Sequence, residues 1–100
     1  RDTDGLALSS RNVYLSKEER ALALSIPQTL QKIASLIAQG ESDVAKLYDF
    51  GMNELKDLQV DYLAFCNHSL EPIKSIIHSQ TLILLTCKVG NTRLLDNLWI

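Results

Sequence analysis

The chain lacks the sequence patterns that identify several large classes of protein. Among its 100 residues, only Cys66 and Cys87 are cysteines, and they form neither a metal-binding spacing nor a disulfide framework. No apolar stretch is long enough to span a membrane, and the polar segment that begins at Arg1 does not resemble a signal peptide. A glycine-rich phosphate loop of the Walker or dinucleotide type is also missing. We therefore expect a soluble, cytoplasmic protein with two small buried thiols.

The chain also has little excess of one sign of charge over the other. The formal net charge is -2, so the chain has no overall positive field to attract nucleic acid or an anionic membrane, and we predict neither partner. Arg1, Arg11 and Arg20 lie among acidic residues, and we interpret that mixture as a solvated surface. Apolar residues make up 46% and charged residues 22%, which is typical of one globular domain. The chain lacks an initiator Met and begins inside a motif, so we expect it to be one domain of a longer protein.

The first half of the chain has helical periodicity. Ser16 and Glu19 form a capping box, which predicts a helix that starts at Lys17. Pro27 removes an amide donor and predicts a break or kink, followed by a longer helix that ends near Gln39. The buried stripe of these helices is predicted to contain Leu22, Ile26, Leu30, Ile33 and Ile37.

A further helix is predicted from Ser42, as its cap, to a point near Asp57. The period then changes. Strands are predicted at 60–67 and 81–89, and 72–79 is interpreted as a loop or turn. Gly90-Asn91 is a tight hairpin signal that turns the chain into a returning strand at 93–98. In the second strand, Ile83, Leu85, Cys87 and Val89 are expected to share one face. The predicted fold class is α+β, a three-stranded antiparallel sheet with helices packed on one face.

The segment Leu8-Ser9-Ser10-Arg11 carries most of the functional content. A triphosphate needs hydrogen-bond donors that can converge from a loop, together with permanent positive charge. Serine hydroxyls supply donors, and the guanidinium of Arg11 can hold two phosphate oxygens. These residues alone are also compatible with an ordinary solvated loop.

A resemblance to a known family changes that balance. The run Asp4-Gly5-Leu6-Ala7-Leu8-Ser9-Ser10-Arg11-Asn12 and the final run Gly90-Asn91-Thr92-Arg93-Leu94-Leu95-Asp96-Asn97 both resemble signatures of pantothenate synthetases, the pantoate–β-alanine ligases. Val60-Asp61-Tyr62 is a looser match. The resemblance implies that Leu8, Ser9, Ser10 and Arg11 contact ATP. It assigns no catalytic residue, no metal ligand and no ligand contact for Asn12 within this chain.

The same resemblance implies an ATP-dependent enzyme that joins pantoate to β-alanine through a pantoyl adenylate, with Mg²⁺ accompanying ATP. Residues 1–100 would be its C-terminal lid domain. A Rossmann-type N-terminal domain, absent here, would hold most of the active site, so we expect the chain alone to be inactive. The full-length protein is expected to be a homodimer. We expect residues 1–12, which have few apolar anchors, to be mobile without that domain.

Other interpretations remain open. A non-catalytic α+β interaction module is the main alternative, and a nucleic-acid binder is disfavoured by the acidity of the chain. We interpret Arg93 and Asp96 as a mutual or surface ion pair. His68 and His78 are expected at the surface. The aromatic residues Tyr62, Phe65 and Trp99 are expected to serve in packing.

Overall fold

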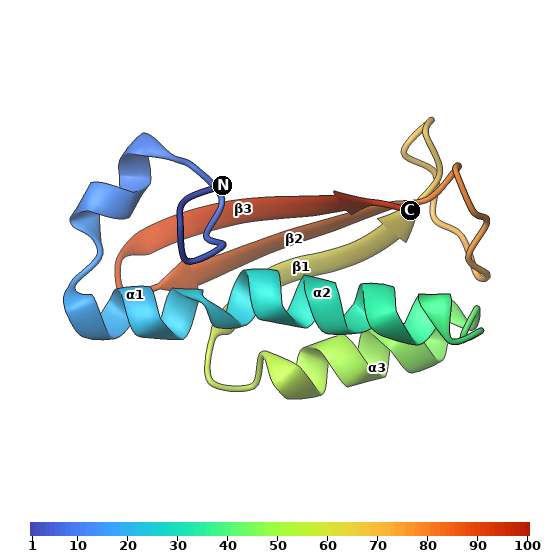
Figure 1. Cartoon of the computed structure of the whole chain (residues 1–100), viewed down its shortest axis with the longest axis horizontal. Coiled ribbons are helices and arrows are strands. Elements are labelled where there is room, and N and C mark those ends of the chain that lie inside the picture. The colour runs from blue at the N-terminus through green and yellow to red at the C-terminus, as the bar shows by residue number, and fades with distance from the viewer.

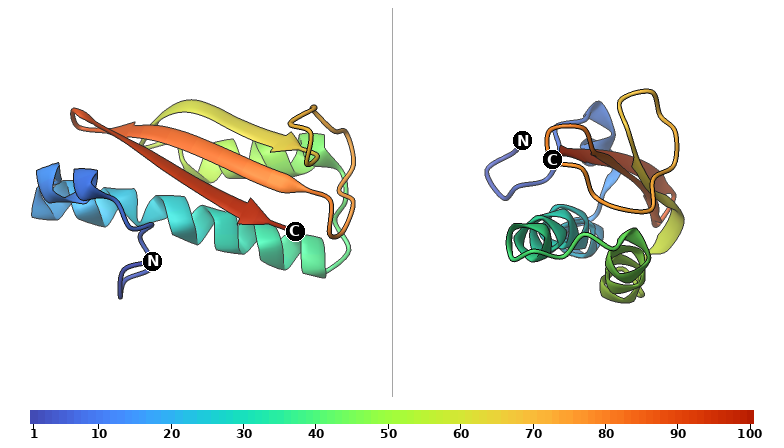
Figure 2. Two further views of the ribbon diagram at one scale, coloured as in Figure 1. Left: turned by 90° about the horizontal axis from the view of Figure 1, so that it is seen from above. Right: turned by 90° about the vertical axis from the view of Figure 1, so that its right-hand side faces the viewer.

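The helices precede the strands, as predicted, in a computed structural model that describes all residues from 1 to 100. The elements are a 3₁₀ helix η1 (Ser10–Tyr14), helices α1 (Lys17–Ala23), α2 (Ser25–Ala38) and α3 (Val44–Glu54), and strands β1 (Gln59–Cys66), β2 (Leu82–Val89) and β3 (Thr92–Trp99). The strands form an antiparallel sheet in the order β1-β2-β3. The helices lie together on one face of this sheet (Figures 1 and 2), which confirms the predicted fold class.

The predicted capping box starts α1. Ser16 Oγ accepts from the Glu19 amide at 3.1 Å, and the Ser16 amide donates to Glu19 Oε1 at 2.8 Å. The break that we placed at Pro27 lies three residues earlier, at Leu24, so Pro27 sits in the first turn of α2. Proline cannot donate to the carbonyl four residues back and its ring crowds that carbonyl, so the helix ends at Ala23 and begins again.

This break also changes which residues of the predicted stripe are buried. Ile26, Leu30, Ile33 and Ile37 are buried as predicted, whereas Leu22 is 44% exposed. Ala23, which is fully buried, lies in the core instead. A continuous 3.6-residue period cannot be carried across an interrupted helix, so the expectation for Leu22 was wrong.

Helix α3 is capped by Asp43 and not by Ser42, because Asp43 Oδ1 accepts from the Ala45 amide at 3.0 Å. The helix ends at Glu54, earlier than the expected end near Asp57. Gly51 is buried, and a Cβ atom there would lie 2.8 Å from Leu63 Cδ2. The glycine therefore allows α3 to approach β1 closely.

The three strands lie within two residues of their predicted bounds, with a register shift in β1 between Val60 and Tyr62. Gly90 and Asn91 form the two-residue connection between the paired residues Val89 and Thr92. Gly90 has φ of 60°, a left-handed conformation that glycine adopts without steric cost. The predicted loop at 72–79 is confirmed. It is tied by isolated bridges from Ser75 to Asp43 and from Pro72 to Cys66.

The core lies between the helices and the covered face of the sheet. The predicted inward residues of β2 are all buried: Ile83, Leu85, Cys87 and Val89. On the other face, Tyr62 is 47% exposed and Trp99 is 60% exposed, so only Phe65 of the three aromatic residues fulfils the packing expectation. Tyr62 and Trp99 are exposed because alternate side chains of a strand point to opposite faces, and theirs point away from the helices. None of the helices combines the length and apolarity needed to cross a membrane.

Candidate functional site

The first six residues form a tight turn that anchors the segment before the candidate loop. The Asp2 amide donates to the Leu6 carbonyl at 2.8 Å, and the Gly5 amide donates to the Asp2 carbonyl at 3.0 Å. Gly5 has φ of 93°, which favours glycine at this position. Leu6 is only 2% exposed and belongs to the main core. Residues 1–12 therefore have one apolar anchor, Leu6, which agrees with the expectation of few such anchors and attaches this turn to the core.

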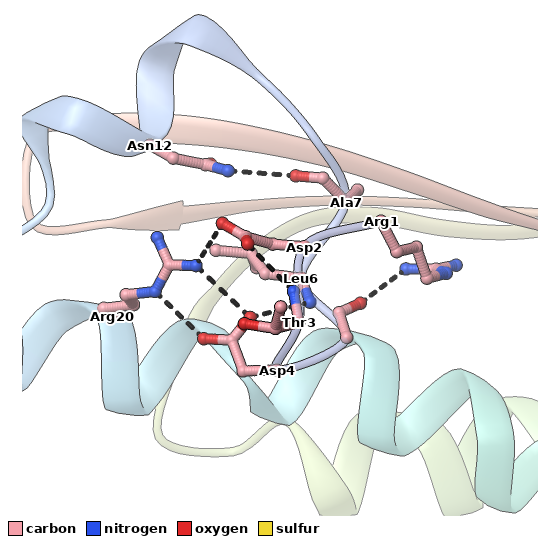
Figure 3. A network of polar contacts seen from close by, with 9 residues as sticks. Arg1, Asp2, Thr3, Asp4, Leu6, Ala7, Asn12 and Arg20 are labelled. Atoms are coloured by element: carbon pink, nitrogen blue, oxygen red, sulfur yellow. Dashed lines mark hydrogen bonds and ion pairs between the residues drawn. The ribbon is translucent and has the colours of Figure 1, made fainter.

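Charged contacts fix the same turn to β3 and α1. Arg1 makes a two-pronged contact with the buried carboxylate of Asp96, at 2.7 and 2.8 Å. Arg20 Nη2 lies 2.8 Å from Asp2 Oδ2, and Arg20 Nε lies 2.9 Å from Asp4 Oδ2 (Figure 3). The Arg20 guanidinium holds the pKa of Asp4 below its usual value. Arg1, Arg20, Asp2 and Asp4 lie at the surface, as expected, and each of them forms an ion pair.

The four residues predicted to contact ATP follow this turn and are exposed. We call Leu8–Arg11 the serine–arginine loop. Leu8 is 71% exposed, and Ser9, Ser10 and Arg11 are exposed as well. Ser9 caps η1, because its Oγ accepts from the Arg11 amide at 3.1 Å. That bond leaves the hydroxyl proton of Ser9 available to donate to a ligand.

Arg11 differs from the other three arginines in having no carboxylate partner. Arg1, Arg20 and Arg93 each pair with a carboxylate, whereas the Arg11 side chain makes only a long contact, 3.4 Å from Nη1 to the Arg93 carbonyl. A guanidinium remains charged at any physiological pH. The loop therefore presents one uncompensated positive charge beside two serines.

Arg11 and Arg93 together line two hollows. The inner hollow, about 220 Å³, also has Ser9, Asn12 and Asp96 in its walls. The outer hollow, about 660 Å³, is lined by Tyr14, Glu19, Asn91 and Thr92 in addition to the two arginines. These hollows are mostly polar, and the inner one has room for a small anionic group.

Of the two options for Arg93 and Asp96, the mutual ion pair is wrong, whereas a surface ion pair is confirmed for Arg93. Arg93 Nε contacts Asp61 Oδ2 at 2.6 Å, and this contact raises the pKa of Arg93. Asp96 follows Arg93 by three residues along β3, so its side chain points to the opposite face of the sheet. There it is buried and pairs with Arg1. Odd spacing along a strand separates two side chains onto opposite faces, which excludes the mutual pair.

Sequence reasoning missed that Arg93, which pairs with Asp61, lies beside the loop. The contact between Arg11 and Arg93 joins residues 82 positions apart. The resemblance marked both runs that contain them, but it gave no sign that the final hairpin lies next to the serine–arginine loop. Only the observed packing of η1 against β3 supplies that information.

Other candidate groups lie outside this site. His68 is exposed and packs edge-to-face against Trp99, with ring centroids 5.0 Å apart, and His78 is exposed, as expected. Both cysteines are buried, and burial raises the pKa of Cys87 to about 11, which suppresses the reactive thiolate. No group of three His, Cys, Asp or Glu residues could hold a metal ion.

A larger hollow of about 790 Å³ lies at the other end of the sheet, between α3, the end of β1 and the 70–74 segment. Its lining is mainly apolar, with Lys74 as its one cationic group. The largest of the three hollows is therefore not one that borders the serine–arginine loop.

Comparison with known proteins places these features in a family. Residues 1–99 match the model of the family described as pantoate-beta-alanine ligase. The whole chain is 56% identical to the pantothenate synthetase of Helicobacter pylori strain G27 and 43% identical to that of Wolinella succinogenes, and it spans 36% of the length of each relative. The crystal structure of pantothenate synthetase from Thermus thermophilus superposes with a TM-score of 0.88 at 35% identity, covering 98% of this chain and 36% of that one.

Proposed function

Because the chain belongs to the pantoate-beta-alanine ligase family, we propose that it is the C-terminal lid domain of a pantothenate synthetase and grips the phosphates of ATP. The observation that carries this proposal is that Arg11 is exposed and, unlike the other arginines, has no carboxylate partner. It lies in a loop with two exposed serines. A triphosphate supplies the missing counter-charge. The alternative of a non-catalytic interaction module is not favoured by the family match.

In the proposed reaction, the complete ligase transfers AMP from ATP to the pantoate carboxylate and releases pyrophosphate. The amine of β-alanine then attacks the carbonyl carbon of the pantoyl adenylate and displaces AMP. Leu8, Ser9, Ser10 and Arg11 act in the first step, where negative charge moves onto the departing pyrophosphate. A charged donor placed at that position stabilises the transition state more than the bound ground state.

The rest of the active site, including the pantoate pocket, is assigned to a Rossmann-type N-terminal domain that this chain does not contain. Mg²⁺ enters this proposal only as a companion of ATP, because the chain offers no cluster of acidic ligands for it. A homodimer of the complete protein belongs to the same proposal and can be tested by sedimentation.

The decisive experiment measures single-turnover AMP transfer to pantoate in the complete ligase. Arg11→Ala should lower the adenylation rate on the order of 10²-fold or more, because it removes a charge-assisted donor from the transition state. Ser10→Ala should cost less. Arg11→Lys should restore only part of the rate, since an ammonium cannot hold two oxygens as a planar fork.

Lys17→Ala is the matched control, because Lys17 is exposed, lies nearby at the start of α1 and forms no ion pair. It removes the same charge and should leave the adenylation rate unchanged. An unaltered rate in Arg11→Ala would remove Arg11 from the phosphate site. The chain of residues 1–100 alone should release no AMP above background, and turnover by it would contradict the proposed division between two domains.

A further inference from the structure

Asn12 connects three parts of the segment that carries the serine–arginine loop. Its side-chain Nδ2 donates to the Ala7 carbonyl at 3.0 Å (Figure 3). Its backbone amide donates to the Ser9 carbonyl, and its own carbonyl accepts from the Leu15 amide, each at 3.1 Å. The side-chain bond joins the two residues that flank Leu8–Arg11, so it closes those four residues into a ring.

The oxygen of the Asn12 side-chain amide, unlike its nitrogen, does not contribute to stability. Asn12 Oδ1 is buried and has no hydrogen-bond partner in the chain. A buried acceptor without a partner destabilises the fold, because it loses its hydrogen bonds to water and gains none in return. The carbonyl of Ala7 can only accept, so Nδ2 must face it, and the amide cannot turn over to place Oδ1 there. The contact to Ala7 is therefore kept at the expense of an unsatisfied atom.

We propose that Asn12 is a positioning residue for the ligase reaction, which holds the serine–arginine loop in the shape that presents Arg11 to phosphate. The inference rests on the proposed ATP role of that loop and assigns no ligand contact to Asn12. Ser9 is bonded to both Asn12 and Arg11 through main-chain groups and its hydroxyl. Fixing Asn12 against Ala7 thus limits the backbone to which the Arg11 side chain is attached.

A double-mutant cycle in the complete ligase tests whether Asn12 acts through Arg11. Asn12→Ala should lower the single-turnover adenylation rate on the order of 10- to 100-fold, the effect of misplacing a catalytic group by about an ångström. The double variant with Arg11→Ala should be no slower than Arg11→Ala alone. Multiplicative losses in the double variant would show that Asn12 acts independently of Arg11 and overturn the proposal.

Asn12→Asp separates the hydrogen bond from the volume of the side chain. It keeps the shape but replaces the donor with an oxygen that faces the Ala7 carbonyl, so it should lose as much rate as Asn12→Ala. Activity near wild type in Asn12→Asp would exclude the donor as the cause. Asn53→Ala is the matched control, because Asn53 is exposed on α3 far from the loop, and its variant should keep the full rate.

A second readout on the 100-residue chain decides the positioning role without ATP. Backbone ¹⁵N order parameters at Ser9, Ser10 and Arg11 should fall in Asn12→Ala and remain unchanged in Asn53→Ala. The unfolding midpoint should change little, since the lost bond is offset by removal of the unsatisfied Oδ1. Unchanged order parameters would overturn the inference even if Arg11 binds phosphate. If the order parameters fall in Asn12→Ala but the adenylation rate of Arg11→Ala is unchanged, the proposed ATP role fails. The restraint of the loop by Asn12 would then still hold.

Discussion

The helix-covered sheet and the segment 1–15 are held by different kinds of contact. The core contains 16 buried apolar residues, drawn mostly from α2, α3 and the three strands. Segment 1–15 contributes only Leu6 to that group, with Leu15 packed against it and partly buried. Its polar contacts are ion pairs and hydrogen bonds to Arg20, Asp96, the Arg93 carbonyl and its own backbone. Burial therefore determines stability in the first region, whereas polar contacts determine geometry in the second. Variants should separate the two effects.

The largest effect is expected from Ile83→Ala in the covered face of β2. Ile83 has no exposed surface, and truncating a fully buried isoleucine typically costs about 2–5 kcal/mol of unfolding free energy. Urea unfolding of the chain measures this loss. Leu95→Ala on the open face is the control, because Leu95 is 60% exposed and its loss should be far smaller. Equal losses at both positions would show that the open face is packed as tightly as the covered one.

Gly90→Ala tests the contact between the β2–β3 turn and the start of α1. Gly90 has a left-handed φ of 60°, and a Cβ atom there would collide with the Glu19 carboxylate that completes the capping box of α1. The left-handed conformation alone costs a residue with a side chain about 1–2 kcal/mol. Urea unfolding should show at least that loss. Asn91→Ala, at the neighbouring exposed position with negative φ, should lose less.

These contrasts explain how much of the molecule could be predicted from the sequence. The strands, the capping box and the inward face of β2 follow local periodicity and turn chemistry, and all were predicted within about two residues. The helix break at Leu24 was misplaced because a proline acts on residues that precede it. Periodicity and turn chemistry did not predict which side chains from distant parts of the sequence contact each other.

The candidate site shows that limit most clearly. The loop residues came from a resemblance, and their roles remain predictions. The mutual pair of Arg93 with Asp96 was wrong, because each contacts a residue more than 30 positions away, Asp61 and Arg1 respectively. No period or spacing encodes such pairs. The Arg1–Asp96 pair follows from the way in which segment 1–15 lies beside β3, and the Arg93–Asp61 pair joins β3 to β1 across the sheet. The sequence revealed neither arrangement.

Thr86→Val sharpens the comparison by removing a polar atom from the sheet. Thr86 Oγ1 is buried without a hydrogen-bond partner, so valine of the same shape should raise the unfolding free energy by about 1 kcal/mol. Thr81→Val is the opposite control. Thr81 Oγ1 exchanges two hydrogen bonds with Ile77, at 3.0 and 2.8 Å, so its loss should destabilise the chain. A rise in unfolding free energy for both variants would show that the hydrogen bonds of the Thr81 hydroxyl do not contribute to stability.

The smallest effect concerns the pH dependence of the charged anchor of segment 1–15. The Thr3 amide and then Arg20 lower the pKa of Asp2, and Arg20 lowers the pKa of Asp4. A carboxyl whose pKa is lower in the folded than in the unfolded state stabilises the fold above its unfolded pKa of about 3.9. This stabilisation is lost as the pH falls through the folded pKa.

Arg20→Gln should therefore be less stable than the wild-type chain at pH 7, and the two should converge as the pH falls below about 4. Both carboxylates are at the surface, where water and salt screen the ion pairs, so the difference should be small and should shrink further in high salt. Urea unfolding from pH 7 to pH 3 measures it, with Lys17→Gln as a control for the charge on α1. A difference that persists unchanged at pH 3 would show that Arg20 stabilises segment 1–15 by packing its stem and not by pairing with Asp2 and Asp4.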